Sequence, residues 1–178
     1  MPVKRIVLIL GGARSGKSSY AQELAKQTGG RVLFCATAEA LDMEMQSRIE
    51  KHRRSRPPGW ETVEASRDIG RVLGRRATEY DAIIIDCITV LVANVMGDGI
   101  DAEKAETSVS AEILGLIRML KRRQSNYFLV SNEAGSGLVP DNRLGRVYRD
   151  ELGKANQLLA AVADEVYLMT AGIPLKLK

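Results

Sequence analysis

Several residue types are scarce in this 178-residue chain, and each scarcity excludes a class of protein. Aromatic residues make up only 4%, which disfavours a module that stacks nucleic-acid bases and predicts a core of Ile, Leu, Val and Ala. The two cysteines, Cys35 and Cys87, fit no zinc pattern and lie in or beside apolar runs, so we predict reduced core thiols. No apolar run approaches the roughly 18 residues of a membrane span, and the run at 6–10 is too short for a signal peptide. We therefore expect a cytoplasmic protein.

The bulk composition is that of a soluble globular protein, with 45% hydrophobic and 27% charged residues. The length predicts a single domain over residues 1–178. The net charge of +4 suits anionic ligands but does not require nucleic acid.

Strand-like and helical patterns alternate along the chain. The predicted strands are 5–10, 31–38, 61–65, 81–87, 127–132 and a terminal pair within 165–178. Helices are predicted at 17–28, 101–123 and 146–163. A further helix with a face of Leu41, Met45 and Ile49 is predicted to end before 56–59, and another is predicted to run from a Ser66 cap through Arg76. This alternation predicts an α/β, P-loop NTPase-like fold: a mostly parallel sheet with helices on both faces and an antiparallel C-terminal edge.

A phosphate-binding loop follows the first strand. It fits G-x-x-x-x-G-K-[ST] in full, with a buried strand before it and a helix after it. Its backbone amides and the helix N-terminus favour phosphate oxygens, Lys17 would reach the β and γ phosphates, and Ser18 would ligate Mg²⁺. The loop consists of Gly11, Gly12, Ala13, Arg14, Ser15, Gly16, Lys17 and Ser18.

A second acidic ligand for Mg²⁺ is expected at the end of a neighbouring strand. Asp86 ends the most apolar interior run and is our candidate. A turn residue that merely ends the strand is the alternative for this position.

His52 is the only histidine in the chain, and it lies among basic residues. It extends the apolar face of the helix that contains Ile49, where a structural histidine is common. A neutral imidazole is also a nucleophile, and nearby guanidinium groups favour its neutral form. The same groups can hold phosphates, so His52 is a candidate to attack a nucleotide phosphorus.

Four blocks together resemble one enzyme family. They are "LGGARSGKSSYAQ", "ATAEALDMEMQSRIEKHRRSRPPGWETVEA", "IIIDCITVLVAN" and "VSNEAGSGLVPDNRLGRVYRDELGKANQLLAAVADEVYLMTAGIP". The chain resembles the bifunctional adenosylcobinamide kinase / adenosylcobinamide-phosphate guanylyltransferase of cobalamin biosynthesis. The resemblance implies phosphorylation of the aminopropanol hydroxyl of adenosylcobinamide by ATP or GTP, and then transfer of GMP from GTP to that phosphate. It also implies a guanylyl-histidine at His52 and a homotrimer.

The resemblance further implies contacts to GTP outside the phosphate loop. Glu64 would accept a hydrogen bond from guanine or ribose, or is an ordinary exposed acid at the end of a strand. The arginines after His52 would neutralise the pyrophosphate. The matching positions are Ala36, Thr37, Ala38, Arg53, Arg54, Ser55, Arg56, Glu64 and Asp86.

The loop at 131–140 follows a strand at the expected ligand-binding edge. It either faces the corrinoid or is an ordinary long loop. Arg143, Arg146 and Arg149 beyond it either contact phosphate or face solvent.

Two rival functions remain at this level. A plain small-molecule kinase would keep all its activity without His52. A nucleotide-dependent nucleic-acid-binding module would use the "KHRRSR" cluster, but the low aromatic content and modest charge argue against it.

Overall fold

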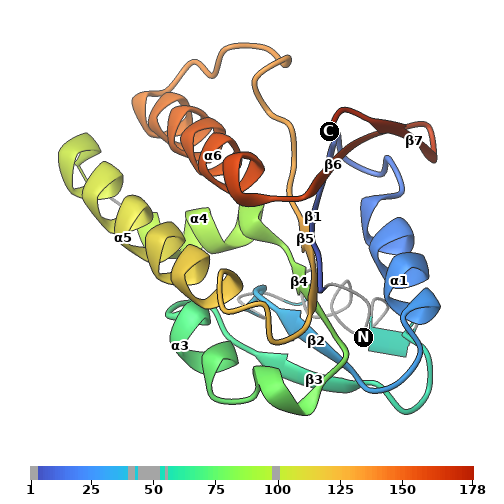
Figure 1. The fold of residues 1–178 in the computed structure, drawn as a ribbon. Coiled ribbons are helices and arrows are strands. Elements are labelled where there is room, and N and C mark those ends of the chain that lie inside the picture. The colour runs from blue at the N-terminus through green and yellow to red at the C-terminus, as the bar shows by residue number, and fades with distance from the viewer. Residues whose placement is uncertain (1–3, 40–42, 44–52, 55, 98–100) are drawn as a thin grey trace.

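The computed structural model describes residues 4–39, 43, 53–54, 56–97 and 101–178. Their strands form one sheet with the order β3-β2-β4-β5-β1-β6-β7 (Figure 1). The first six strands run parallel, and β7 pairs antiparallel with β6, as the sequence predicts. The strands are β1 (Ile6–Gly11), β2 (Val32–Ala36), β3 (Glu61–Glu64), β4 (Ala82–Asp86), β5 (Asn126–Val130), β6 (Glu165–Thr170) and β7 (Ile173–Lys176).

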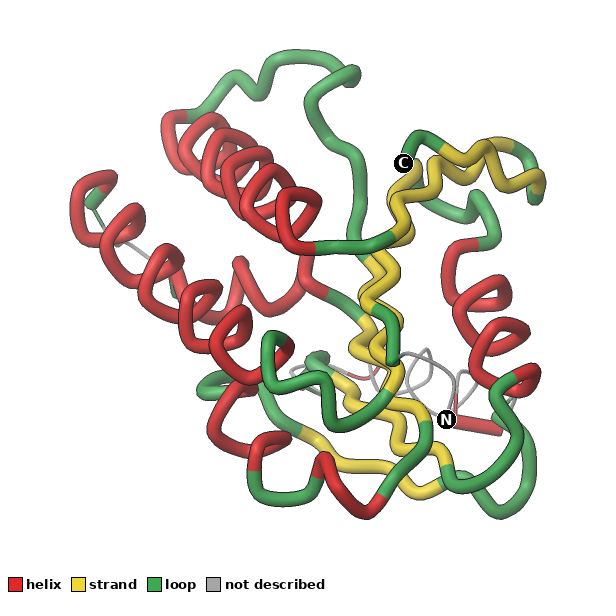
Figure 2. Tube along the Cα trace, viewed as in Figure 1, coloured by secondary structure: helices red, strands yellow, loops and turns green. Residues whose placement is uncertain are grey.

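Helices cover both faces of the sheet (Figure 2). Among the described residues, helix α1 packs on one face of the sheet, and α3, α4, α5 and α6 pack on the opposite face. The helices are α1 (Lys17–Gln27), α3 (Ile69–Gly74), α4 (Ile88–Met96), α5 (Ala102–Leu120) and α6 (Arg143–Val162), with a 3₁₀ turn at Ala77–Glu79.

The central strands are apolar on both faces because each face meets a different core. In β1, Ile6 and Leu8 pack under α3, α4, α5 and α6, whereas Val7 and Ile9 pack under α1. Alternate side chains of a strand point to opposite faces, so a strand buried on both sides must be a continuous apolar run. The core is built mostly of Ile, Leu, Val and Ala, as predicted, and a few aromatic rings, among them Phe34, Phe128 and Tyr127, are also buried in it.

The structure corrects three predicted helix boundaries. Ser66 does not cap α3, since Asp68 occupies the N-cap with φ 54° and the Glu112 carboxylate accepts the amides of Asp68 and Ile69. Helix α6 begins at Arg143, three residues before the predicted start, because the Asn142 side chain caps it by accepting the amide of Gly145. Helix α5 ends at Leu120, before the predicted end at residue 123.

The sequence pattern does not predict helix α4, because its residues are almost uniformly apolar and show no polar face. The predicted helix with Leu41, Met45 and Ile49 lies outside the described residues. In the described part of the chain, no helix is both long and apolar enough to cross a membrane.

Candidate active site

The loop between β1 and α1 adopts a conformation that only glycine accepts at two positions. Gly11 has φ 152°, and a Cβ there would lie 2.6 Å from the Met169 carbonyl oxygen. Gly16 has φ 95°, and a Cβ there would lie 3.3 Å from the Cα of Gly172. The glycines of the motif are therefore required by the backbone angles and by the close approach of β6 and of the turn that follows it.

Lys17 is held inside this loop. Its side chain is 8% exposed, and its Nζ donates to the Gly12 carbonyl oxygen at 2.5 Å and to Ser15 Oγ at 3.5 Å. Burial lowers the pKa of Lys17, while the nearby Cys87 and Asp86 raise it. The first amides of α1 have no carbonyl partner within the helix, as at every helix start. Together these groups form a cationic, donor-rich cradle suited to phosphate oxygens.

A cavity of about 520 Å³ opens over this cradle. It lies at the carboxyl ends of β1, β4 and β5, which is where open α/β sheets bind ligands. Asp86, at the end of β4, lines the same cavity as Lys17 and Ser18. The full lining is Ala13, Arg14, Ser15, Gly16, Lys17, Ser18, Ser19, Asp86, Cys87, Val130 and Asn132. The structure thus brings the predicted acid together with the phosphate loop.

The sequence analysis did not name Ser19, Val130 or Cys87 as lining residues, and it included Asn132 only as part of the loop at 131–140. Asn132 and Cys87 each follow a buried strand closely, Cys87 directly after β4 and Asn132 two residues after β5. A polar residue just past the carboxyl end of a parallel strand was the available signal. Both cysteines are free, as predicted, and Cys35 is fully buried in β2.

Thr37 directly follows β2 and contacts the chain after β4. It is fully buried, and its Oγ1 accepts the amide of Cys87 and donates to the Cys87 carbonyl, each at 2.8 Å. The peptide bond between Asp86 and Cys87 is cis. Thr37 therefore fixes the position of the segment that carries Asp86. Of its neighbours, Ala36 is the last residue of β2 and is buried, and Ala38 lies two residues beyond the strand and is half-buried.

Arg56, four residues after His52, approaches the same edge. The guanidinium of Arg56 lies 3.8 Å over the Phe34 ring, and its Nη1 donates to Thr62 Oγ1 at 2.9 Å. Burial lowers the pKa of Arg56, whereas the charges of Asp86 and Glu64 raise it. Arg56 is thus within electrostatic range of both acids.

The remaining predicted positions are exposed or outside the described residues. Arg53 and Arg54 are exposed, and Glu64 is exposed at the end of β3. His52 and Ser55 lie outside the described residues.

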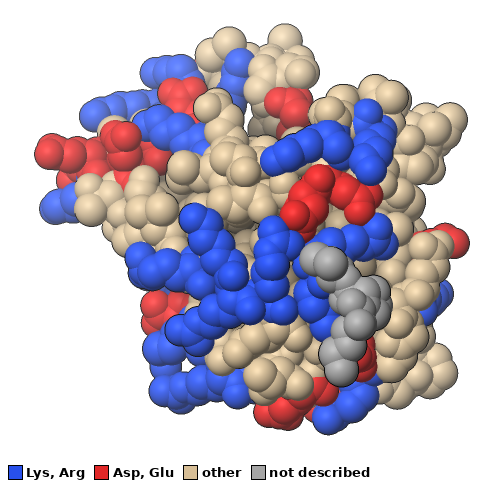
Figure 3. All heavy atoms as spheres, viewed as in Figure 1, with Lys and Arg blue, Asp and Glu red and all other residues tan. Residues whose placement is uncertain are grey.

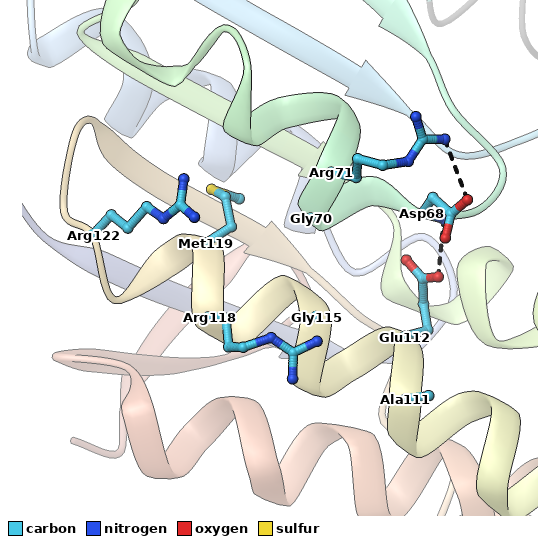
Figure 4. Close-up of a pocket in the computed structure, with 9 residues that line it drawn as sticks. All are labelled: Asp68, Gly70, Arg71, Ala111, Glu112, Gly115, Arg118, Met119 and Arg122. Atoms are coloured by element: carbon cyan, nitrogen blue, oxygen red, sulfur yellow. Dashed lines mark hydrogen bonds and ion pairs between the residues drawn. The ribbon is translucent and has the colours of Figure 1, made fainter.

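A different basic surface lies over α3 and the C-terminal end of α5, where Lys and Arg form a band (Figure 3). A cavity of about 390 Å³ between these helices is lined by Arg71, Arg118 and Arg122. The three guanidinium groups do not converge (Figure 4), and Arg71 turns back to Asp68 at 3.3 Å. This cavity lacks the convergent donors of the phosphate loop.

Comparison with known proteins agrees with this geometry. The family model "Cobinamide kinase / cobinamide phosphate guanyltransferase" matches residues 7–177. The chain is 39% identical over 181 aligned positions to the bifunctional adenosylcobalamin biosynthesis protein CobU of Escherichia coli (strain K12), covering 97% of this chain and 99% of the relative.

Two further relatives are also matched over nearly their whole length. The chain is 41% identical to CobU of Salmonella typhimurium, with 97% of this chain and 99% of the relative covered. It is 38% identical to the bifunctional adenosylcobalamin biosynthesis protein CobP of Pseudomonas aeruginosa, with 96% of each covered. The chain therefore belongs to the cobinamide kinase / cobinamide phosphate guanyltransferase family and is a bifunctional enzyme of cobalamin biosynthesis.

Proposed function

We propose that this enzyme phosphorylates the aminopropanol hydroxyl of adenosylcobinamide with ATP or GTP and then transfers GMP to that phosphate through His52. One nucleotide-binding domain, residues 1–178, would carry both steps. The strongest support is the single cavity that Lys17, Ser18 and Asp86 share at the carboxyl edge of the sheet. The family description supports the two reaction classes.

The kinase step uses the phosphate loop. The corrinoid hydroxyl oxygen bonds to the γ phosphorus, and the bond from that phosphorus to the leaving nucleoside diphosphate breaks. The hydroxyl proton passes to a phosphate oxygen or to water. Lys17 and the amides of residues 13–18 stabilise the charge that develops on the phosphate oxygens. Asn132 lies in the same cavity and can hydrogen-bond either the phosphate or the acceptor.

The residues present fit Mg²⁺. The Ser18 hydroxyl and Asp86 carboxylate are oxygen donors on the same cavity, and the described residues contain no larger metal-binding cluster of His, Cys, Asp or Glu. Mg²⁺ usually binds through one or two protein oxygens together with substrate phosphates, so a small donor set is what it needs. Held there, Mg²⁺ would neutralise phosphate charge.

The guanylyl step needs a nucleophile, and His52 would supply it. A ring nitrogen of His52 bonds to the α phosphorus of GTP as pyrophosphate leaves, and the corrinoid phosphate oxygen then displaces the imidazole. Dividing the transfer in this way replaces one difficult step by two easier ones. Arg53, Arg54 and Arg56 would balance the pyrophosphate charge, and Glu64 would accept a hydrogen bond from guanine or ribose.

We also propose that the enzyme assembles as a homotrimer. Ile173, Leu175 and Leu177 alternate along the C-terminal segment and are 69%, 58% and 57% exposed. Alternate residues of a strand share a face, so the three form an apolar stripe that a second copy can cover. Light scattering of the native protein should give the mass of three chains, and Leu175→Lys should lower it.

Labelling with GTP carrying ³²P at the α phosphorus tests the covalent step. We expect the wild-type enzyme with Mg²⁺ to retain label after denaturation, and the label to be acid-labile and base-stable. His52→Asn should retain none, because the amide is not a nucleophile. His52→Asn should still transfer labelled γ phosphate to adenosylcobinamide, because Lys17 and Ser18 are intact. Lys17→Met should lose both reactions.

Two results would contradict the proposal. Full guanylylation by His52→Asn would place the nucleophile elsewhere. A wild-type enzyme that phosphorylates the corrinoid but never yields a GDP-linked product would be a plain kinase.

A further inference from the structure

A cavity separate from the phosphate-loop cavity opens between α4 and the start of α6. Its volume is about 630 Å³. Ala93, Met96, Leu144 and Tyr148 give it apolar surface, and Arg67 and Asn142 add polar groups. No residue of the nucleotide chemistry described above lines it. A mixed apolar and polar lining of this size suits part of a large amphiphilic ligand.

At two places, a single residue links the wall of one cavity to the wall of the other. Tyr148 donates to the Thr89 carbonyl at 3.2 Å, and Thr89 Oγ1 accepts at 2.7 Å the amide of Asn132, which lines the phosphate-loop cavity. Asn94, on the wall of the new cavity, donates to the Thr37 carbonyl at 2.8 Å, and Thr37 in turn holds Cys87. The two cavities are therefore neighbours along the same edge of the sheet.

The distance between them suits a short substrate arm. Ala93 lies six residues beyond Cys87 along α4, which is roughly 9 Å at about 1.5 Å per residue. The amide-linked aminopropanol arm of a cobinamide, about six bonds long, spans roughly 7 Å. A ring seated in the new cavity can thus present its terminal hydroxyl near the phosphate loop.

The loop before α6 carries two exposed apolar side chains. Leu138 and Val139 at its tip are 96% and 65% exposed. Arg149 donates to the Gly135 carbonyl at 2.8 Å, and Arg146 donates to the carbonyls of Pro140 and Asp141 at 3.0 and 2.7 Å. These arginines hold the loop against α6. Exposed adjacent apolar side chains on an anchored loop mark a binding surface.

We propose that this cavity, together with the Leu138–Val139 tip, binds the corrin ring of the acceptor. The methyl groups on the ring edge meet Ala93, Leu144 and Tyr148, and the peripheral amides meet Arg67 and Asn142. The aminopropanol arm passes over the wall formed by Thr37 and Thr89 to the phosphate-loop cavity. This assignment rests on the proposed function, because it needs a corrinoid substrate.

A bulky side chain in the cavity tests the assignment. Ala93→Trp fills space at an exposed helix position, and Ala161→Trp places the same ring at an exposed position of α6 that does not line the cavity. We expect Ala93→Trp to weaken adenosylcobinamide binding in equilibrium dialysis, and to raise its KM, by at least about tenfold. The KM for the nucleotide and the α-phosphate label should not change. Ala161→Trp should match the wild type.

A second pair of variants guards against misfolding. Leu138→Ser removes an almost fully exposed side chain, and Leu114→Ser changes a 45% exposed leucine on α5. We expect Leu138→Ser alone to weaken corrinoid binding, by about threefold to tenfold. If Ala93→Trp and Leu138→Ser bind the corrinoid as their controls do, the assignment is wrong while the proposed function stands. If the wild type binds nucleotide but neither binds nor phosphorylates the corrinoid, the cavity assignment and the proposed function are both wrong.

Discussion

At the scale of single residues, Thr37 shows how partners within the protein decide a side chain's role. Its amide donates to the Asp86 carbonyl at 3.1 Å, its carbonyl accepts from Asn94, and its hydroxyl contacts Cys87. Each polar atom of this buried residue already has a partner. Thr37 is thus a positioning residue for Asp86, and the resemblance by itself gave no way to see this.

The two thiols give a prediction on pH dependence. Burial is the main cause that raises the pKa of Cys87 to about 11 and that of Cys35 to about 12. Only the thiolate is nucleophilic, so alkylation of native Cys87 should be slow at pH 7.5 and rise about tenfold per pH unit up to pH 10. Cys35 should react only after unfolding, since it is fully buried.

Mass spectrometry after timed treatment with iodoacetamide measures both sites. Saturating GTP should slow the reaction of Cys87 further, because this residue lines the phosphate-loop cavity. Rapid alkylation of Cys87 at pH 7.5 would contradict a raised pKa for this thiol.

At the scale of elements, α3 and α5 approach closely through two glycines. A Cβ on Gly70 would lie 2.5 Å from the Gly115 carbonyl oxygen. The same contact brings Glu112 of α5 to the first amides of α3, where its carboxylate replaces an ordinary cap. The short helix α3 is therefore fixed mainly by its neighbour.

Gly70→Ala tests this close approach. We expect the free energy of unfolding to fall by about 1–3 kcal/mol, since backbone atoms cannot move aside cheaply. Gly74→Ala is the control on the same helix, where a Cβ would lie 3.6 Å from Met119 Cγ, an ordinary contact. Urea denaturation midpoints with equal m-values measure both changes. Equal midpoints for the two variants would show that α3 and α5 separate readily.

At the scale of the whole molecule, the parallel topology brings distant segments to one edge. The phosphate loop after β1, Asp86 after β4 and Asn132 after β5 meet there because the strands share one direction. Nucleotide bound at this edge contacts several elements at once. Its binding energy should therefore stabilise the fold as a unit.

Thermal unfolding with and without Mg²⁺-GTP measures that coupling. At a free GTP concentration of about 100 Kd, we expect about 2.7 kcal/mol of added stability. For a chain of this length, that corresponds to a rise in Tm of roughly 5–10 °C. Lys17→Met should abolish the rise, and Lys26→Met, an exposed position at the end of α1, should keep it. An equal rise in Lys17→Met would place the nucleotide away from the phosphate loop.

Local patterns predicted much of the fold. The strands of the parallel sheet, the phosphate loop, α1 and the antiparallel C-terminal pair follow from apolar runs and from glycine spacing. These features depend on residues close to one another in the sequence, so one sequence is enough to predict them. Helix α4 was missed because a helix buried on nearly all sides lacks the polar face that marks helical periodicity.

The sequence alone determined the phosphate loop, since the positive φ angles at Gly11 and Gly16 and the placement of Lys17 are local properties of eight residues. It also determined the parallel α/β class and the family. Only the tertiary structure decided that Asp86 and Ser18 line one cavity, that Thr37 holds the end of β4, and that a second cavity adjoins the first. These features join residues dozens of positions apart, and strand order and helix packing, which are non-local, bring them together.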